Sequence, residues 1–130
     1  MAIALAFEAL DEKDLEALVE KEQEASGWPI RCAGCGHPIT TADRRIEMGG
    51  AHAHRFANPA GFVYEIGCFR DAPGCRNRGE PTLEWTWFPG HPWSISVCGR
   101  CTAHLGWAYG AGDGGGAFFG LILERLAEEP

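Results

Sequence analysis

The first part of the chain combines apolar and acidic positions with the spacing of a helix. Between Ala4 and Ala25 apolar residues recur at roughly helical intervals, and acidic residues lie between them. This pattern predicts an amphipathic helix with acids in its early turns. Its apolar stripe consists of Phe7, Leu10, Leu15, Leu18 and Val19. We expect the stripe to pack on the rest of the protein; alternatively, it binds a protein partner or another copy of the chain.

The composition changes near Gly27, where Glu and Lys give way to Gly, Pro, Cys and aromatic residues. This change predicts two parts, a helical arm at 1–26 and a β-rich domain at 27–130. Within the domain, HAHRFANPAGFVYEI at 52–66 predicts a β-hairpin. Its turn would be Asn58-Pro59-Ala60-Gly61, with proline in the second position and glycine in the fourth.

Later segments predict further strands and loops. LEWTWF at 83–88 alternates, which predicts a strand with Leu83, Trp85 and Trp87 on one face. WSISVC at 93–98 predicts another strand, and GAGDGGGA at 110–117 predicts a mobile loop. FFGLILERL at 118–126 has helical spacing but is short and follows glycines, so its pattern fits either helix or strand.

Length and charge narrow the class of protein. A chain of 130 residues, 45% hydrophobic and 22% charged, is the size and composition of one globular domain. A net charge of -7 without a basic cluster argues against a nucleic-acid partner. The N-terminus lacks the basic region of a signal peptide, and no apolar run reaches membrane-spanning length. We therefore expect a cytoplasmic protein that binds neither nucleic acid nor membranes.

Two Cys-x-x-Cys pairs predict a metal site. Cys32 with Cys35 and Cys98 with Cys101 can each turn two thiolates toward one ion, and two such pairs complete a tetrahedral zinc site. Four thiolates leave no position for water, so the predicted role of the zinc is structural. Four free core cysteines or a redox pair are weaker alternatives.

Other candidate ligands and thiols are left over. Cys68 and Cys75 are separated by a turn and are expected to be free thiols, although a disulfide is sterically conceivable. His52 and His54 would share a face of a strand, and we expect them to form ordinary hydrogen bonds.

Aromatic residues are concentrated between Trp85 and Tyr109, a stretch with four of the five tryptophans. Composition alone favours a hydrophobic core, because aromatic side chains bury large areas. Tryptophan also carries a polar N–H, and the neighbouring prolines and glycines indicate an exposed rim, which favours a rigid aromatic box around a small ligand. If a box forms, Trp107 is a partly solvated wall, whereas Phe119 belongs to the core.

Residues from about Ile30 to Leu126 resemble the cereblon-type thalidomide-binding domain, called the CULT domain, in its stand-alone bacterial form. The resemblance rests on CAGCG, RFANPAGFV, Gly-x-Pro-x-x-Glu at 79–84, WFPGHPW, the second cysteine pair, HLGWAY and FFGL. It implies a β-tent, in which two antiparallel sheets meet at a steep angle and are pinned by the zinc site. It also implies that FFGLI is a strand.

The same resemblance implies a ligand site. Trp87, Trp93 and Trp107 would form three walls of a cage, and Tyr109 its base. Trp85 stands where animal cereblon has histidine, so a side-chain hydrogen bond is lost or replaced there. The full set of implied ligand-binding residues is Asn58, Pro59, Glu84, Trp85, Thr86, Trp87, Trp93, Trp107 and Tyr109.

The function implied is non-enzymatic binding of cyclic imides, meaning glutarimide-, succinimide- or uracil-like rings of the thalidomide type. The partner would be a small molecule or an imide-bearing peptide end, and no residue is expected to be catalytic. Two alternatives stay open. One is an enzyme like methionine sulfoxide reductase B, with Cys75 as the reactive thiol. The other is a structural interaction domain whose aromatic residues are only core.

Overall fold

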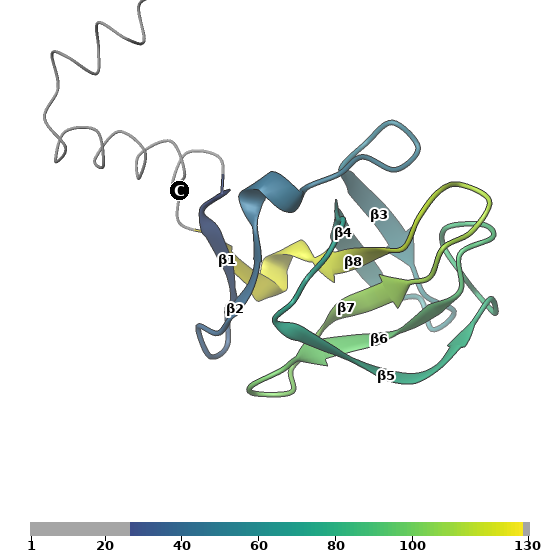
Figure 1. The fold of residues 1–130 in the computed structure, drawn as a ribbon. Helices are drawn as coiled ribbons and strands as arrows, with labels where there is room; N and C mark the ends of the chain where they lie inside the picture. Colours follow the sequence, from purple (N-terminus) through teal and green to yellow (C-terminus); the bar gives the residue numbers. More distant parts are fainter. Residues whose placement is uncertain (1–26, 129–130) are drawn as a thin grey trace, which may run out of the picture.

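The computed structural model describes residues 27–128, which form two antiparallel β-sheets (Figure 1). The predicted arm at 1–26 therefore lies outside the described residues. The strands are β1 (Pro29–Cys32), β2 (Pro38–Thr41), β3 (Ala53–Ala57), β4 (Val63–Phe69), β5 (Cys75–Thr82), β6 (Trp93–Cys98), β7 (His104–Tyr109), β8 (Phe118–Ile122) and β9 (Leu126–Glu128). Two 3-10 helices, η1 (Ala42–Arg44) and η2 (Leu123–Arg125), connect strands. Within this part of the chain no helix is long and apolar enough to cross a membrane.

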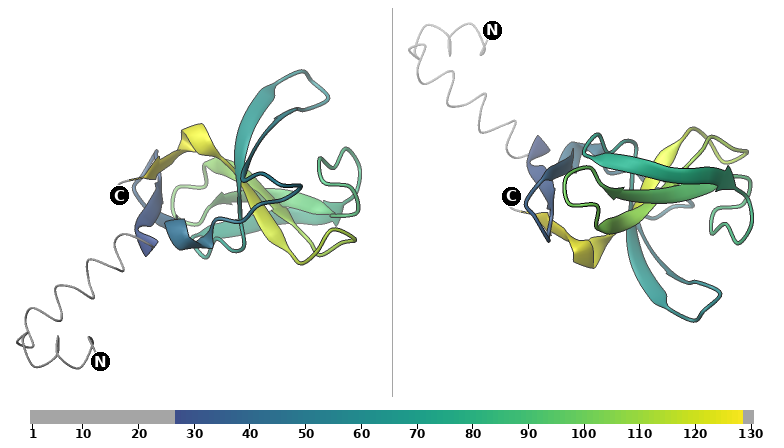
Figure 2. Two further views of the ribbon diagram at one scale, coloured as in Figure 1. Left: turned by 90° about the horizontal axis from the view of Figure 1, so that it is seen from above. Right: turned by 90° about the horizontal axis from the view of Figure 1, so that it is seen from below.

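The two sheets differ in size and in the part of the chain that builds them. A three-stranded sheet has the order β2-β1-β9, and a six-stranded sheet has the order β3-β4-β8-β7-β6-β5. Because β1 pairs with β9, the small sheet joins the two ends of the described chain. Figure 2 shows the small sheet at one end of the molecule and the β3–β4 hairpin projecting from the large sheet.

The predicted hairpin is confirmed, and its turn has the expected chemistry. β3 and β4 pair in antiparallel register, ending at Ala57 opposite Val63. The Gly61 amide donates to the Asn58 carbonyl at 2.9 Å, and Gly61 has a φ of 89°, which glycine adopts at little cost. The Asn58 side chain also accepts a hydrogen bond from the Phe62 amide at 2.9 Å. The turn residues alone therefore account for the position of the loop.

Two strand predictions are also confirmed. WSISVC is β6, and FFGLI is β8, despite the helical spacing of its apolar residues. Strand β8 lies between β4 and β7 in the large sheet. Burial on both faces explains its nearly continuous apolar sequence, because such a strand needs no alternation.

The predicted strand at 83–88 is wrong. Strand β5 ends at Thr82, and a turn follows in which the Thr86 amide donates to the Leu83 carbonyl at 3.2 Å. Trp85 has a φ of 60°, a left-handed conformation that interrupts an extended strand. The Thr86 hydroxyl donates to the His91 carbonyl at 2.7 Å, which closes the loop on itself. The alternation of Leu83, Trp85 and Trp87 thus belongs to a loop.

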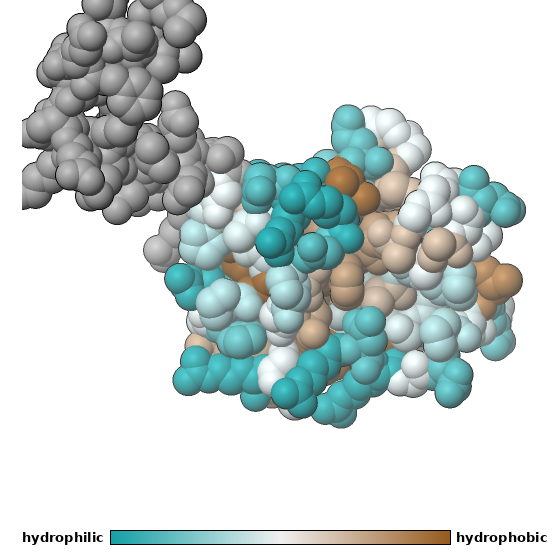
Figure 3. Space-filling view, viewed as in Figure 1, coloured by the Kyte–Doolittle hydropathy of each residue, from teal (hydrophilic) through white to brown (hydrophobic). Residues whose placement is uncertain are grey.

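Apolar side chains form two regions of core. One lies between the two sheets and includes Ile30, Ile39, Phe69, Leu105 and Leu121. The other lies on the large sheet and includes Ile66, Phe88, Trp107, Tyr109, Phe118 and Ile122. The face of the molecule drawn in Figure 3 is mixed, with hydrophilic residues near its top and along its lower edge and weakly to strongly apolar residues between them.

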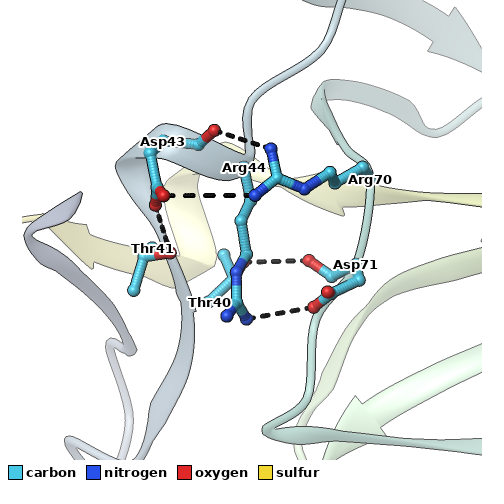
Figure 4. Close-up of polar contacts among 6 residues, drawn as sticks. All are labelled: Thr40, Thr41, Asp43, Arg44, Arg70 and Asp71. Carbon is cyan, nitrogen blue, oxygen red and sulfur yellow. Dashed lines mark hydrogen bonds and ion pairs between the residues drawn. The ribbon is translucent and has the colours of Figure 1, made fainter. Parts of the chain in front are cut away.

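A polar network at the surface links the small sheet to the end of β4 (Figure 4). Arg44 of η1 forms an ion pair with Asp71 at 3.1 Å, and Arg70 donates to the Asp43 carbonyl at 3.1 Å. The Thr40 hydroxyl donates to the Asp71 carbonyl at 2.9 Å. Exposed ion pairs contribute only about 0–1 kcal/mol each, so this network orients the segments more than it stabilises them.

Candidate metal centre and aromatic cavity

The four cysteines of the two pairs come together at one point between the sheets. Their sulfur atoms all lie within 4.8 Å of one another. Cys32 and Cys101 are 3.7 Å apart at Sγ, and Cys35 and Cys98 are 3.6 Å apart. A tetrahedral ion with sulfur ligands at about 2.3 Å needs sulfur–sulfur distances of about 3.8 Å. The group therefore has the spacing required to bind one metal ion.

Tight turns present these sulfur atoms. The Gly36 amide donates to the Cys32 carbonyl at 2.8 Å, and the Thr102 amide donates to the Cys98 carbonyl at 3.0 Å. Each turn contains a residue of positive φ, 78° at Gly36 and 65° at Thr102. Because Cys32 ends β1 and Cys98 ends β6, an ion held here would tie the small sheet to the large one.

The environment of Cys98 favours the thiolate. Desolvation acts to raise its pKa, but hydrogen bonds from the backbone amides of Cys101 and Arg100 outweigh it and lower the pKa to about 7. The Arg100 amide lies 3.4 Å from the sulfur. Since metal ions bind the thiolate form, this arrangement suits ligation.

The two remaining cysteines are free thiols, as expected. Cys68 is buried, and desolvation raises its pKa to about 12. Desolvation also raises the pKa of Cys75. Neither thiol is activated for nucleophilic attack, so nothing here favours a reductase that depends on Cys75.

His52 and His54 have the ordinary roles that were expected. The His52 ring lies 3.1 Å from the Ile46 carbonyl, and the His54 ring lies 2.9 Å from the Ala51 carbonyl. In each case the carbonyl can only accept, so the ring nitrogen facing it is the protonated one.

An aromatic cavity of about 290 Å³ lies on one face of the large sheet, beside the hairpin turn. Its lining consists of Asn58, Pro59, Tyr64, Trp85, Trp87, Trp93, Ile95, His104, Trp107 and Tyr109. Seven of the nine residues implied by the sequence are in this lining. Glu84 and Thr86 are not in the lining.

Strand register places two of the aromatic walls and the base of the cavity. Trp93 of β6 is opposite Tyr109 of β7, and Ile95 is opposite Trp107, so these four side chains share one face. The Trp93 indole donates to the Glu84 carbonyl at 2.7 Å, which joins β6 to the loop after β5. This bond is the role that the structure gives to Glu84.

The third aromatic wall, Trp87, comes from that loop. The Trp87 indole donates to the Ala57 carbonyl at 3.1 Å, at the base of the hairpin turn. Its ring meets Trp107 edge-on, with centroids 4.8 Å apart and planes 73° apart. The Thr86 hydroxyl bond to His91 fixes the same loop. Trp87 is therefore held from two sides by elements distant in sequence.

The cavity has a buried base and an exposed rim. Trp107 is 9% exposed and Tyr109 is 3% exposed, whereas Ile95 is 41% and Trp85 is 67% exposed. Trp107 thus belongs to both the core and the cavity, and it is more deeply buried than the partly solvated wall that was expected. Phe119, expected in the core, is partly buried and packs against the core between the sheets.

Burial changes the chemistry of two groups near the base. Desolvation raises the pKa of Tyr109 well above its ordinary value, so the phenol stays protonated. Desolvation, together with the charge of Arg125, lowers the pKa of His104, while its hydrogen bond to the Gly106 carbonyl acts in the opposite direction. The base of the cavity is therefore uncharged at neutral pH.

Three lining residues were missed by sequence reasoning: Tyr64, Ile95 and His104. Ile95 alternates with Trp93 along β6, so the period of two could have identified it. Tyr64 reaches the cavity from β4, where it contacts Trp107 edge-on with centroids 5.3 Å apart. No local signal marks Tyr64, because its place in the cavity depends on its contact with Trp107, on a strand far away in the sequence.

A larger cavity of about 750 Å³ lies where the two sheets meet, lined by residues that include Ile30, Arg45, His52 and Glu128. Arg45 and Glu128 form an ion pair with each other, and His52 is bound to a carbonyl. The aromatic cavity is the better candidate for binding a flat ring, because its lining is mainly aromatic and apolar with few polar groups.

Comparison with known proteins gives one consistent result. No protein-family model matches this chain. The chain is 38% identical to protein cereblon of Drosophila grimshawi over 72 residues, which is 52% of this chain and 11% of that protein. It is 36% identical over 56 residues to protein cereblon of Danio rerio and of Gallus gallus, covering 43% of this chain and 13% of each relative. The chain therefore spans only about a tenth of the length of the curated relatives it matches.

Proposed function

We propose that this protein, which contains a cereblon-type domain, binds cyclic imides in its aromatic cavity without catalysing a reaction. The observation that carries this proposal is the convergence of Trp87, Trp93 and Trp107 on one cavity with Tyr109 at its base. The ligand is a flat ring whose N–H lies between two carbonyls, as in glutarimide, succinimide or uracil.

The cavity offers complementary groups for such a ring. Aromatic walls bury its apolar part, and main-chain groups of the loop can meet its polar edge. Within the described residues, the main-chain groups of Trp85 and Trp87 form no hydrogen bond, so a donor and an acceptor are available there. The left-handed conformation of Trp85 turns the backbone of this loop away from the strand pattern.

The expected affinity is modest. Burial of roughly 100–130 Å² of ligand at about 25 cal/mol/Å² contributes around 3 kcal/mol. Two or three neutral hydrogen bonds add about 1 kcal/mol each. A total near 6 kcal/mol corresponds to dissociation constants of about ten to a hundred micromolar, before the entropy of association is considered. Such values suit a sensor or scavenger better than a tight carrier.

We further propose that the ion at the four cysteines is zinc, in a structural role. Zn²⁺ prefers tetrahedral thiolate ligands, and four protein sulfur atoms leave no position for water or substrate. The six cysteines are all free of disulfides, which fits a reducing compartment such as the cytoplasm. We also propose that the domain begins near Gly27 and that the arm at 1–26 binds a protein partner.

A titration of tryptophan fluorescence tests imide binding. Glutarimide, succinimide, hydantoin and uracil are added to the full chain, and each imide that binds should change the emission saturably. Trp28 lies outside the cavity, so Trp28→Phe should keep the signal, whereas Trp93→Ala should weaken binding by about thirtyfold or more. If no cyclic imide binds at millimolar concentration, or if Trp93→Ala binds as tightly as the natural chain, the proposal is wrong.

A further inference from the structure

Strand β5 places a positive charge on the face of the sheet that carries the cavity. β5 is the outer strand of the large sheet, next to β6 (Figure 1). Arg78 of β5 is opposite Ile95 of β6, and Ile95 is opposite Trp107 of β7. Directly opposed residues of antiparallel strands point to the same face. Arg78, Ile95 and Trp107 therefore form one row across three strands.

This row runs from the base of the cavity to the surface. Trp107 is almost fully buried, Ile95 at the rim is nearly half exposed, and Arg78 beyond it is exposed. A substituent that leaves the cavity over Ile95 comes next to Arg78. Neighbouring strands are only about 4.8 Å apart, and a long side chain reaches even diagonal neighbours at about 7–8 Å.

Arg78 has no acidic partner within ion-pair distance among residues 27–128, where the ion pairs are made by Arg44, Arg45 and Arg70. The nearest acid along β5, Glu80, lies beyond the irregularity that shifts the register after Arg78, where Gly79 has a φ of 85°. The guanidinium is thus available to an anion from outside, in a protein whose overall charge of -7 otherwise repels one.

We propose that Arg78 makes the cavity selective for cyclic imides that carry a carboxylate on the substituent leaving the ring. The ring occupies the aromatic cavity, and the carboxylate pairs with the guanidinium outside the rim, where two parallel N–H donors fit its two oxygens. This proposal rests on the imide binding proposed above and adds the chemistry of the substituent to it.

Arg76 provides a matched control on the same strand. It lies two residues before Arg78 and shares its face. It is opposite Val97, and its side chain lies over the second cysteine turn, with Cγ 3.6 Å and Nε 3.7 Å from the position a Cβ would take at Gly99. Arg76 carries the same charge as Arg78. Because its side chain lies over the cysteine turn, this charge is directed away from the cavity.

The test uses two probes of nearly equal shape. Both are 3-aminoglutarimide acylated on the amine, one with succinic acid, which leaves a free carboxylate, and one with the corresponding neutral amide. At low ionic strength the carboxylate probe should bind the natural chain about three to five times more tightly than the neutral probe, the range expected of an exposed ion pair. Salt at about 0.5 M should remove this preference. Arg78→Gln should also remove it without changing affinity for the neutral probe, and Arg76→Gln should preserve it.

Several results would overturn the proposal. Equal binding of the two probes by the natural chain would remove the role of Arg78 but leave imide binding intact. A preference for the carboxylate probe that survives in Arg78→Gln would show that another group causes it. A preference lost equally in Arg78→Gln and Arg76→Gln would show that it comes from the overall surface charge. An equal loss of both probes in Arg78→Gln would indicate a structural role. If neither probe binds the natural chain, imide binding itself fails, and this proposal fails with it.

Discussion

The Trp93 indole donates a hydrogen bond to the main-chain carbonyl of Glu84, with 2.7 Å between nitrogen and oxygen. This bond joins a wall of the aromatic cavity on β6 to the loop that carries Trp85 and Trp87. It gives the polar atom of a partly exposed tryptophan a fixed partner, so the ring is held in place before any ligand arrives. Such pre-organisation lowers the entropic cost of binding.

Replacing Trp93 with phenylalanine should separate the contribution of an aromatic wall from that of the hydrogen bond that positions it. Trp93→Phe keeps an aromatic wall but loses the bond to Glu84, so affinity for glutarimide should fall by about fivefold, the equivalent of one neutral hydrogen bond. The free energy of unfolding should change by about 1 kcal/mol or less, because Trp93 is only partly buried. Titration and a urea melt of both proteins measure the two effects. Unchanged affinity would show that the bond to Glu84 does not position the wall.

Removal of one metal ligand should unfold much of the domain. Cys32→Ala or Cys98→Ala leaves three thiolates and breaks the link between the sheets, and metal-binding free energy is folding free energy at such a site. Elemental analysis of the natural chain should find one zinc per chain, and circular dichroism of each variant should show lost structure. Cys68→Ala is the control, since Cys68 is buried outside the four-cysteine group and should keep the zinc. A folded natural chain without any metal would contradict this prediction.

A comparison of Trp107→Ala with Leu105→Ala should distinguish cavity from core on one strand. Trp107 packs in the core and also lines the cavity, so its truncation should cost about 3–5 kcal/mol of stability and abolish measurable imide binding. Leu105 is fully buried between the sheets, away from the cavity, and its truncation should cost about 2–5 kcal/mol. Binding by the folded fraction of Leu105→Ala should stay within about twofold of the natural chain. If both variants bind imide equally well, the aromatic cluster is packing alone.

Deletion of residues 1–26 should leave imide binding nearly unchanged. Every residue that lines the cavity lies at or after Asn58. The same fluorescence titration on the shortened chain, with zinc content measured in parallel, gives the comparison. A large loss of affinity with zinc still present would show that the arm contributes to the site and that the domain boundary at Gly27 is misplaced.

The free energy of unfolding should decrease as the pH is lowered through the range in which His104 is protonated in the unfolded chain but not in the folded one. Burial lowers the pKa of folded His104 below its ordinary value of 6.5. Between these two pKa values the unfolded chain binds more protons, so the free energy of unfolding decreases with falling pH and levels off below the folded pKa. Urea melts from pH 7.5 to pH 5 on the natural chain and on His104→Gln measure the difference. An identical pH dependence in both proteins would exclude this contribution.

Local sequence determined a large part of this protein. The Asn-Pro-Ala-Gly turn placed the β3–β4 hairpin, the segment WSISVC predicted β6, and the cysteine spacing identified the four residues whose sulfur atoms lie together. Each of these features depends on residues close in sequence, or on a spacing that few alternatives share. Resemblance to the cereblon-type domain predicted that FFGLI is a strand, which the helical spacing of its apolar residues did not indicate, and this segment is β8.

Tertiary structure decided the rest. The alternation at 83–88 had the local features of a strand, but the left-handed Trp85 and the bond from Thr86 to His91 turn this segment into a loop. Tyr64 of β4 lines the cavity and contacts Trp107 of β7, a strand that is not its neighbour in the sheet. Arg78 reached the cavity face through its register with Ile95. Register and loop closure depend on contacts between residues far apart in the chain, and no local pattern contains those contacts.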